Sequence, residues 1–340
     1  MRAVRLDAPG ARLRVVEVPT PEPTGTEARI RVAGCGVCHT DLHIVDGSQP
    51  RVDSPLILGH EVAGRVDALG PDAEGVAIGD SVLVFGGWGC GACSECASGN
   101  EQRCPNGRSP GFQADGGYAE YVLVPHPRHL VPLGSLDPVE AAPLADAGLT
   151  PYRAVRRAEP WLRAGARVLV IGCGGLGQFA LQYLRILPAA GRDLVVVVAE
   201  RSAARLERAT ELGADIALLD PDAAVVGEPA DVVLDFVGND ETLALAAQVV
   251  APNGLVMLVG EGGGEVNFGF ERPAVEAWLT TTAWGSIDEL RDVVRLANDR
   301  RVAWAVETIE LAEAQSAHKR LRAGDAHGRI VLVPGPAPPD

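Results

Sequence analysis

Residues 167–177 read Arg167-Val168-Leu169-Val170-Ile171-Gly172-Cys173-Gly174-Gly175-Leu176-Gly177. The first five residues predict a strand buried on both faces of a sheet, because the run is almost entirely apolar and β-branched or leucine. Four glycines follow within six residues, and a helical pattern then runs from about Leu176 to Leu187, before Pro188. This stretch therefore predicts a strand, a tight turn and a helix in immediate succession.

The same rhythm continues downstream to about residue 285. Further strands are predicted at residues 194–199, 215–219, 231–236 and 255–259, and further helices at residues 203–212 and 241–250. Strands that alternate with helices at this spacing are typical of βαβ units and of a doubly wound parallel sheet. The chain is therefore predicted to be an α/β protein over this region.

The flanking regions have a different pattern. Short Val/Ile runs separated by turn-forming residues predict an irregular, mostly antiparallel β domain before residue 150; these runs are residues 28–32, 61–66, 81–85 and 119–124. After residue 285 we expect a helix, a strand, a second helix and a last strand, with the helix at 287–298 and the strands at 302–309 and 329–333. The closing residues 334–340 are Pro-rich and are predicted to be a disordered tail.

Composition excludes several classes of protein. The 340 residues are 47% hydrophobic and carry a formal charge of −15 without a charged tail, which argues against nucleic acid and anionic membranes as partners. No apolar run reaches the roughly 20 residues that span a bilayer, and the N-terminus lacks a signal-peptide pattern, so a cytoplasmic location is expected. The only lysine, Lys319, follows no Gly-rich loop, which disfavours P-loop and pyridoxal phosphate enzymes.

The glycine turn has the G-x-G-x-x-G spacing of a dinucleotide-binding site, directly between the predicted strand and helix. Gly172 permits the turn, Gly174 lets the backbone approach a pyrophosphate, and Gly177 lets the helix pack on the strand. With Gly175 and Leu176 they bring the helix N-terminus, which attracts anions, to the phosphates. Glu200, 23 residues beyond Gly177, stands where an acid accepts hydrogen bonds from the ribose hydroxyls.

Glu200 also favours NAD over NADP. A carboxylate about 4 Å from a 2′-phosphate would repel it by about 4 kcal/mol per unit charge at an effective dielectric of about 20. Arg201 follows directly and could offset part of this repulsion. The expected cofactor is therefore NAD(H).

Four cysteines, Cys90, Cys93, Cys96 and Cys104, lie within fifteen residues that are interleaved with glycines. Four thiolates in such a loop fit a tetrahedral structural zinc with no open position. An iron–sulfur cluster is the alternative, but there is no second cysteine-rich region and two acidic residues lie in the loop. We expect a structural zinc here.

Cys38 and His60 suggest a second metal site. Both follow glycine-containing turns, and a cysteine, a histidine and one further ligand that leave a fourth position open form a catalytic zinc site. Each residue taken singly also fits a buried free thiol or a histidine at the start of a strand. Spacing alone does not identify the third ligand.

Taken together, these features resemble the zinc-dependent medium-chain alcohol dehydrogenases, and most of all the bacterial NAD-dependent secondary alcohol dehydrogenases. The resemblance covers essentially the whole chain; it rests on the glycine turn, the four-cysteine lobe, and the segments Cys38-His39-Thr40-Asp41, Gly59-His60-Glu61, Gly86-Gly87-Trp88-Gly89-Cys90, residues 142–152 and Ala283-Trp284-Gly285. It implies a GroES-like catalytic domain at residues 1–150 with the zinc lobe at 88–106, a Rossmann NAD-binding domain at 151–284, and a return to the catalytic domain at 285–340.

The resemblance also implies roles for single residues. Asp146 would be the third ligand of the catalytic zinc, and Glu61 would coordinate that zinc transiently. Thr40 would receive the proton of the alcohol, and His43 would pass it to solvent through the nicotinamide ribose. His39 and Arg329 would contact the cofactor pyrophosphate and Arg205 would lie near the adenine. Trp88 and Trp284, with Phe112, are expected to line the substrate pocket.

The expected activity is thus the interconversion of alcohols with ketones or aldehydes by hydride transfer to and from NAD. Apolar secondary alcohols are expected to be the preferred substrates. Two Zn²⁺ ions are expected per chain. A homodimer or homotetramer is implied. A polyol or amino-alcohol dehydrogenase, and a non-catalytic protein on the same scaffold, remain alternatives. Cys35 and Cys173 have no ligand role in the family pattern. Cys35 is expected to be a buried thiol, and its mis-ligation or oxidation is the alternative. Oxidation of Cys173 would impair cofactor binding.

Overall fold

The computed structural model describes residues 1–49, 52–187, 193–220, 222, 226–270, 272–326 and 328–335. The chain divides into two compact units: unit 1 is residues 1–149 with 284–340, and unit 2 is residues 150–283. Only the first two residues of the predicted tail lie within the described part. None of the helices in these ranges has the length and apolar composition that a membrane span requires.

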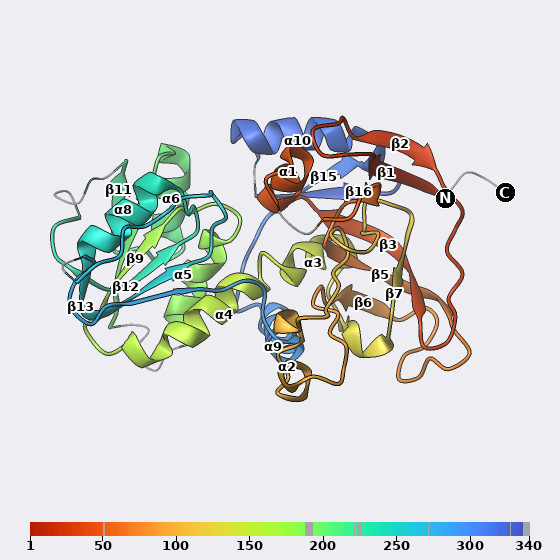
Figure 1. Ribbon diagram of the computed structural model, residues 1–340, viewed down its shortest axis with the longest axis horizontal. Coiled ribbons are helices and arrows are strands. Elements are labelled where there is room, and N and C mark those ends of the chain that lie inside the picture. Colours follow the sequence, from red (N-terminus) through yellow and green to blue (C-terminus); the bar gives the residue numbers. More distant parts are fainter. Residues whose placement is uncertain are drawn as a thin grey trace. The chain divides into compact units, whose positions relative to one another are not determined.

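Unit 2 is built on a six-stranded, all-parallel sheet in the order β11-β10-β9-β12-β13-β14. Its strands are β9 (Arg167–Ile171), β10 (Val195–Glu200), β11 (Ile216–Leu219), β12 (Ala230–Asp235), β13 (Val250–Leu258) and β14 (Trp278–Thr281). Its helices are α4 (Leu149–Ala158, which begins at the last residue of unit 1), α5 (Gly177–Ile186), α6 (Ala203–Glu211) and α8 (Asp240–Val249). Figure 1 shows α6 and α8 beside these strands.

The predicted α/β pattern of unit 2 is confirmed, and the strand order explains its site. Helices α5 and α6 follow β9 and β10, whereas α8 follows β12 on the other side of β9 in the sheet. The direction of winding therefore reverses between β9 and β12, and the carboxyl ends of strands at such a point form the binding crevice of doubly wound folds. The glycine turn lies at the carboxyl end of β9.

Three elements of unit 2 differ from the prediction. Helix α4 was not predicted. Strand β14 was missed because its four residues are only partly buried and show no clear apolar run. Strand β13 begins at Val250 rather than Leu255, since the turn formers Pro252, Asn253 and Gly254 lie within the strand and disguise its start. The register of β12 against β13 is irregular at that point.

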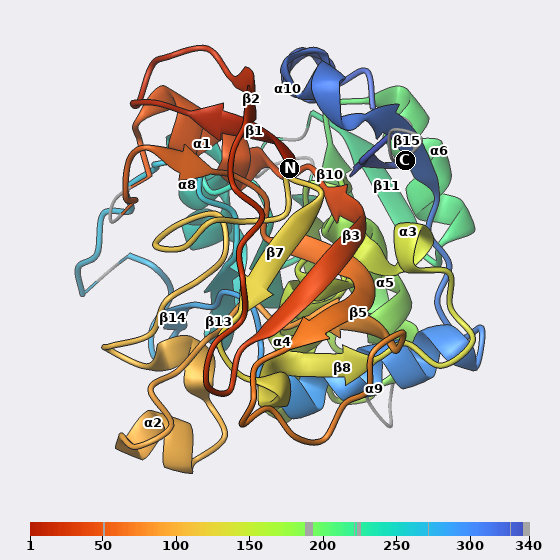
Figure 2. The same ribbon diagram turned by 90° about the vertical axis from the view of Figure 1, so that its right-hand side faces the viewer.

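Unit 1 contains the predicted irregular antiparallel β domain. A seven-stranded sheet has the order β15-β16-β3-β5-β6-β8 with β7 paired to β3, and a small sheet has the order β2-β1-β4. The strands are β1 (Arg2–Leu6), β2 (Arg14–Glu17), β3 (Ala28–Gly36), β4 (Leu56–Ile57), β5 (Glu61–Leu69), β6 (Ser81–Val84), β7 (Tyr121–Val124), β8 (Leu130–Pro132), β15 (Val306–Glu310) and β16 (Arg329–Val333). Figure 2 shows β3 with its neighbours β5 and β7.

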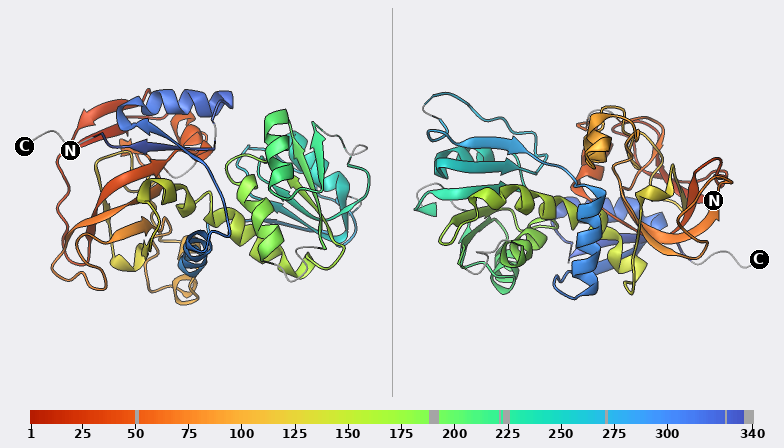
Figure 3. Two further views of the ribbon diagram at one scale, coloured as in Figure 1. Left: turned by 180° about the vertical axis from the view of Figure 1, so that it is seen from behind. Right: turned by 90° about the horizontal axis from the view of Figure 1, so that it is seen from below.

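The helices of unit 1 are α1 (His39–Asp46), α2 (Ser94–Ala97), α3 (Pro138–Ala141), α9 (Ile287–Asn298) and α10 (Ala314–Ala323), with the 3-10 turn η3 (Ala142–Ala145). Helix α9, seen end-on and side-on in the two views of Figure 3, packs against β8 and η3. The predicted strand at 302–309 begins only at Val306, where pairing with β16 starts, and the Trp304 indole donates to the carbonyl of Glu140 instead.

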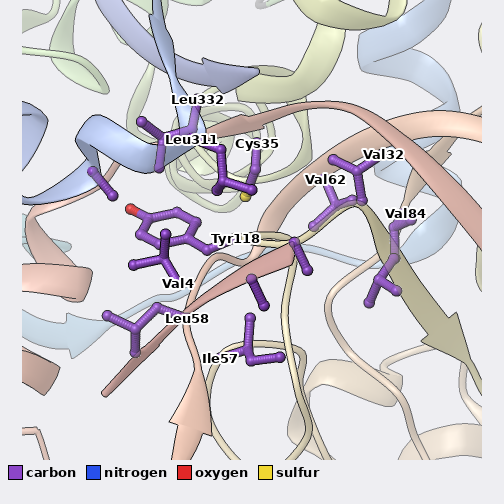
Figure 4. Close-up of a cluster of buried hydrophobic side chains, with 14 of the residues drawn as sticks. Val4, Val32, Cys35, Ile57, Leu58, Val62, Val84, Tyr118, Leu311 and Leu332 are labelled. Carbon is purple, nitrogen blue, oxygen red and sulfur yellow. The ribbon is translucent and has the colours of Figure 1, made fainter. Parts of the chain in front are cut away.

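The core of unit 1 lies between its sheets and helices α1 and α10. It is formed by side chains from β1, β3, β5 and β6 together with Tyr118, Leu311 and Leu332, some of which are drawn in Figure 4. Cys35, on β3, is fully buried in this core, as expected for a structural thiol. Burial raises the pKa of the Cys35 thiol well above its usual value, so that it stays protonated and unreactive.

Candidate active site

Three potential metal ligands from separate segments of unit 1 converge. Cys38 is the N-cap of α1, His60 directly precedes β5, and Asp146 follows η3. All three side chains are buried, and their ligand atoms lie within 4.8 Å of one another. The Asp146 Oδ2 atom is 3.8 Å from Cys38 Sγ and 3.5 Å from His60 Nε2.

These distances fit a tetrahedral zinc ion. Zn–S bonds of about 2.3 Å and Zn–N and Zn–O bonds of about 2.0–2.2 Å place tetrahedral S and O ligands about 3.6 Å apart, and N and O ligands about 3.4 Å apart. The observed separations differ from these values by only one or two tenths of an ångström. Because the group has three ligands rather than four, it leaves one position open, as in catalytic zinc sites.

The charges around His60 also suit a cation. Burial lowers the pKa of His60, but the carboxylates of Asp41 and Asp146 outweigh burial and hold this pKa well above its usual value. The buried carboxylates therefore favour a positive charge at this site. A metal ion bound there would displace the proton from the imidazole.

Asp41 lies behind His60, on the side away from Asp146. Its Oδ2 accepts a hydrogen bond of 2.9 Å from the Cys38 backbone N–H, and this bond completes a capping box at the start of α1. Its Oδ1 is 3.6 Å from His60 Nδ1. Neither of these last two atoms has a hydrogen-bond partner among the described residues, so the contact between them is an ion-pair contact.

Helix α1 begins directly after Cys38 and carries the predicted residues His39, Thr40 and His43. Thr40 Oγ1 is 3.6 Å from Cys38 Sγ, and the Thr40 side chain is half-buried. His43 is also half-buried, with Nδ1 3.4 Å from the hydroxyl of Ser48. His39 is exposed at the first position of the helix.

Glu61 and Arg329 form a buried ion pair next to the metal ligands. One Nη atom of Arg329 is 2.7 Å from both carboxylate oxygens of Glu61, and the Ala147 backbone N–H donates to the same carboxylate at 3.1 Å. Burial raises the pKa of Glu61 and the guanidinium opposes this rise. In this arrangement Glu61 is held by Arg329, and Arg329 is 4% exposed.

Aromatic rings line the space beside His60. The Phe112 ring lies 5.5 Å and the Trp284 ring 6.3 Å from the imidazole, and the two rings meet edge to face at 5.9 Å. Trp284 has a left-handed backbone with φ of +47°, a strained conformation for a bulky residue, and its indole packs against Gly86. The ring of Trp88, also expected in the pocket, lies 6.5 Å from the ring of His129.

The four cysteines of the predicted lobe also come together, around the short helix α2. Cys93 Sγ is 3.5 Å from Cys96 Sγ and 3.7 Å from Cys104 Sγ, close to the roughly 3.8 Å between thiolates on a tetrahedral zinc. Backbone N–H groups of Ala92 and Cys93 lower the pKa of the Cys90 thiol to about 6, whereas burial raises the pKa of the Cys96 thiol to about 12. The donor set is complete and leaves no open position.

The glycine turn of unit 2 has the backbone that a dinucleotide site needs. Gly172 has φ of +86°, and a Cβ on Gly177 would lie 2.0 Å from the Gly172 carbonyl oxygen, so both positions require glycine. A Cβ on Gly174 would meet no atom within 4 Å, which leaves the space in front of the turn open. Helix α5 begins at Gly177, so its free N–H groups lie next to that space.

Glu200, at the end of β10, is bound to the same turn. Its carboxylate accepts hydrogen bonds from the backbone N–H groups of Cys173 at 2.8 Å, Arg201 at 2.8 Å and Ser202 at 3.1 Å. Arg205 Nη1 is 3.9 Å from it. The Arg201 side chain, in contrast, pairs with Asp220 and Glu241. Cys173 is 5% exposed, and burial raises the pKa of its thiol to about 12.

Asp41 had no predicted role, whereas Phe112 and Trp284 were expected in the substrate pocket. The capping-box spacing Cys38-x-x-Asp41 is a local signal that predicts the Asp41–Cys38 contact, although not the contact with His60. Phe112 and Trp284 are 172 positions apart, and no local pattern relates them.

Comparison with known proteins agrees with this geometry. The alcohol dehydrogenase GroES-like domain matches residues 24–135, and the zinc-binding dehydrogenase domain matches residues 212–332. The chain is 36% identical to an NAD-dependent alcohol dehydrogenase of Sulfurisphaera tokodaii, over 98% of this chain and 100% of that protein. It is 37% identical to a D-arabinose 1-dehydrogenase (NADP(+)) of Saccharolobus solfataricus, over 95% and 94% of the two chains.

Among solved structures, the alcohol dehydrogenase of Aeropyrum pernix matches with a TM-score of 0.91 at 33% identity, over 98% of this chain and 100% of that one. Identity above 30% over nearly the full length of the chain, with both domain matches, establishes a common family. The fold is therefore a GroES-like domain combined with a Rossmann-type domain, and the chain belongs to the zinc-binding alcohol dehydrogenase family of oxidoreductases.

Proposed function

We propose that this enzyme interconverts apolar secondary alcohols and ketones with NAD(H), and that the substrate oxygen binds at the open position beside Cys38, His60 and Asp146. The observation that carries the proposal is this buried ligand set, whose spacing fits zinc and which has room for one more ligand. Zinc bound there would lower the pKa of an alcohol hydroxyl, as it lowers that of water. NAD would accept the hydride.

The chain's own residues supply the proton path. Thr40 is near enough to Cys38 to reach an oxygen at the open position, and its hydroxyl can accept the alcohol proton while donating its own. His43, one helical turn further along α1, is the base that takes this proton onward. Its half-buried position beside Ser48 supports a route toward solvent.

The apolar substrate class is supported by the walls of the site. Phe112 and Trp284 present ring faces and edges beside His60, and such surfaces bind hydrocarbon groups better than hydroxyl groups. The test is a screen of NAD reduction with primary, secondary and polyhydroxy alcohols on protein whose zinc has been quantified. Highest kcat/KM for an apolar secondary alcohol is the expected result.

A polyhydroxy substrate is the second candidate, and the similarity to a D-arabinose 1-dehydrogenase favours it. In the same screen, higher kcat/KM for a sugar than for a secondary alcohol of equal size would establish this candidate and reject the first. Turnover of neither class by zinc-loaded protein would reject both.

We further propose NAD rather than NADP as the cofactor. The Glu200 carboxylate is fixed at the turn by three backbone N–H groups, where it would repel a 2′-phosphate. The adjacent Arg201 is neutralised by Asp220 and Glu241. We expect Glu200→Ala to reduce the preference for NAD in kcat/KM. A ratio of the two cofactors that stays unchanged would contradict the electrostatic argument.

We also propose two zinc ions per chain and association into dimers or tetramers. Unit 2 exposes an apolar group at and before its edge strand β14: Phe268 is 77%, Phe270 94%, Val275 59% and Trp278 57% exposed. Exposed apolar residues and an unpaired strand edge are typical of a surface that binds another chain. Sedimentation velocity at micromolar concentration tests this, and a monomer would contradict it.

A further inference from the structure

A column of buried polar side chains extends away from the metal ligands into the core of unit 1. Behind Asp41, the hydroxyl of Tyr118 lies 3.2 Å from Asp41 Oδ2, and on its other side 3.1 Å from Nε2 of His318. Asp41 and Tyr118 are fully buried, and His318 is 3% exposed. The column therefore leads from His60 through α1 and the segment before β7 to helix α10.

Tyr118 is held in place by its backbone and its ring. Its N–H donates to the Leu58 carbonyl at 2.9 Å, and its carbonyl accepts from Val4 at 2.7 Å. The ring packs so closely on Gly59 that a Cβ there would lie 2.5 Å from Tyr118 Cδ1, and Figure 4 shows it among the buried side chains of the core. The same side chain thus contacts the turn that carries His60 and the carboxylate behind His60.

The donor and acceptor capacities of these side chains determine which group donates in each hydrogen bond of the column. The Asp41 carboxylate can only accept, so the Tyr118 hydroxyl donates its single proton to Asp41. The remaining lone pairs of that hydroxyl then accept the N–H of His318 Nε2. Burial lowers the pKa of His318, which favours a neutral ring with one N–H available for this bond. Every donor along the column points toward Asp41.

We propose that Tyr118 and His318 are positioning residues of the metal site. His318 orients the Tyr118 hydroxyl, and this hydroxyl holds the Asp41 carboxylate in place. Asp41 in turn holds the His60 ring with Nε2 toward the metal. The inference rests on the proposed function, namely that Cys38, His60 and Asp146 bind zinc. Outer partners of a ligating histidine fix its tautomer and its ring orientation, and their loss typically costs about 10–100-fold in metal affinity. Tyr118 and His318 lie one and two hydrogen bonds beyond Asp41, so we expect an effect on metal affinity of about 10-fold, the lower end of this range.

Zinc release from the intact, zinc-loaded protein to a chromogenic chelator tests the proposal. The phase that belongs to the open site is identified as the one lost in Asp146→Ala. Tyr118→Phe, which removes only the hydroxyl, should speed this phase about 10-fold, and His318→Leu should speed it by a similar or smaller factor. His318→Gln, whose amide can still donate to the hydroxyl, should restore a rate within about twofold of the original.

Two control variants separate positioning from general loosening. Tyr183→Phe removes another fully buried hydroxyl, which lies in unit 2 and has no hydrogen-bond partner in the described part of the chain, and it should leave the phase unchanged. Arg322→Ala removes an ion pair of 2.9 Å between α10 and Asp46 on α1 and tests whether looser docking of α10 suffices. An equal acceleration in Arg322→Ala, or rates in Tyr118→Phe and His318→Leu equal to the original, would overturn the proposal.

A double-variant cycle tests the route through Asp41. In an Asp41→Asn background, Tyr118→Phe should change the release rate by less than about twofold, because the interaction it served is already altered. Full additivity would overturn the proposed route. Should the original protein show no phase that Asp146→Ala removes, the zinc assignment itself fails, an outcome distinct from an intact phase that is insensitive to Tyr118.

Discussion

Arg329 and Glu61 show how a single pair of residues can stabilise a site from within. They are 268 positions apart, yet their charged groups meet at 2.7 Å in the interior of unit 1, beside the backbone of Ala147. A buried charge that lacks its partner is far more costly than a buried pair. Because Ala147 follows Asp146, the pair also fixes the segment that presents a metal ligand.

We expect Arg329→Met to lower the free energy of unfolding by about 3–5 kcal/mol, since it leaves the Glu61 charge buried and unpaired. The double variant Arg329→Met/Glu61→Gln should lose less, because it removes both charges. Urea unfolding followed by circular dichroism measures both values. A double variant less stable than the single one would contradict the ion-pair account.

We expect the stability of unit 1 to depend on pH through His129. It is 1% exposed, and burial together with Arg128 and His126 lowers its pKa to about 3. Between about pH 6.5 and pH 3 the unfolded chain therefore binds a proton here that the folded chain does not. The free energy of unfolding must fall as pH decreases through this window, by up to about 1.4 kcal/mol per pH unit.

Replacing His129 with Phe removes this dependence. Relative to the original protein, His129→Phe should gain about 2 kcal/mol of unfolding free energy between pH 6.5 and pH 5, and the difference should be constant between pH 7 and pH 8. Denaturant unfolding at each pH measures it. Parallel curves down to pH 5 would show that His129 takes up its proton in the folded state.

His43 is expected to be the base of the proton path. His43→Ala should slow alcohol oxidation at and below neutral pH by up to about 100-fold, with little effect at alkaline pH, and added imidazole should restore part of the rate. The measurement is the pH–rate profile with and without imidazole. A profile that is unchanged and insensitive to imidazole would leave Thr40 to transfer the proton directly to water.

At the scale of elements, the turn between β9 and α5 has one glycine that is needed for packing and another that we expect to be needed for cofactor binding. Gly177 is needed for the contact of α5 with the Gly172 carbonyl, whereas Gly174 faces open space. We therefore expect Gly177 to affect the stability of unit 2 and Gly174 to affect NAD binding. Two alanine substitutions can separate them.

Gly177→Ala should destabilise unit 2 by about 1–3 kcal/mol, because its Cβ would overlap the Gly172 carbonyl oxygen. Gly174→Ala should leave stability within about 0.5 kcal/mol but weaken NAD binding at least 10-fold, since its methyl group enters the space where the pyrophosphate is expected. Thermal unfolding and fluorescence titration with NADH measure the two effects. Unchanged affinity in Gly174→Ala would argue against cofactor binding at this turn.

At the scale of the whole molecule, two groups of ligands in unit 1 have different tasks. The four-cysteine group closes a surface lobe around α2, and Arg128 links this lobe to the rest of unit 1 by hydrogen bonding to the Gly89 carbonyl at 2.7 Å. The group of three is buried and has an open position. Metal bound at the first site is expected to contribute to stability, and metal at the second to turnover.

Metal analysis should give two zinc ions per chain, of which the open site exchanges faster. Cys93→Ser should lose one zinc and lower the midpoint of thermal unfolding, whereas Cys38→Ser should lose the other zinc and all turnover while the fold persists. Inductively coupled plasma spectrometry and calorimetry measure these outcomes. One zinc per chain, or an iron–sulfur absorption band, would contradict the assignment of the lobe.

Local sequence determined most of the elements and the cysteine group. The five residues before Gly172 form β9 as predicted, α9 and β16 have the predicted bounds, and the four cysteines lie close enough in the chain to gather around one ion. These features depend on hydrogen bonding and side-chain contacts between near neighbours, which leave a periodic or spaced pattern in the sequence. The short edge strand β14 left no such pattern.

The surroundings of the metal ligands were decided by tertiary structure. Asp146 could be named as a ligand only through family resemblance, and the contact of Glu61 with Arg329 and the column from Asp41 through Tyr118 to His318 had no local signal at all. Each joins side chains from segments that meet only when the sheet of unit 1 forms and α10 packs on α1. Buried polar atoms must find partners wherever the fold brings them, and this requirement acts across the whole core rather than along the chain.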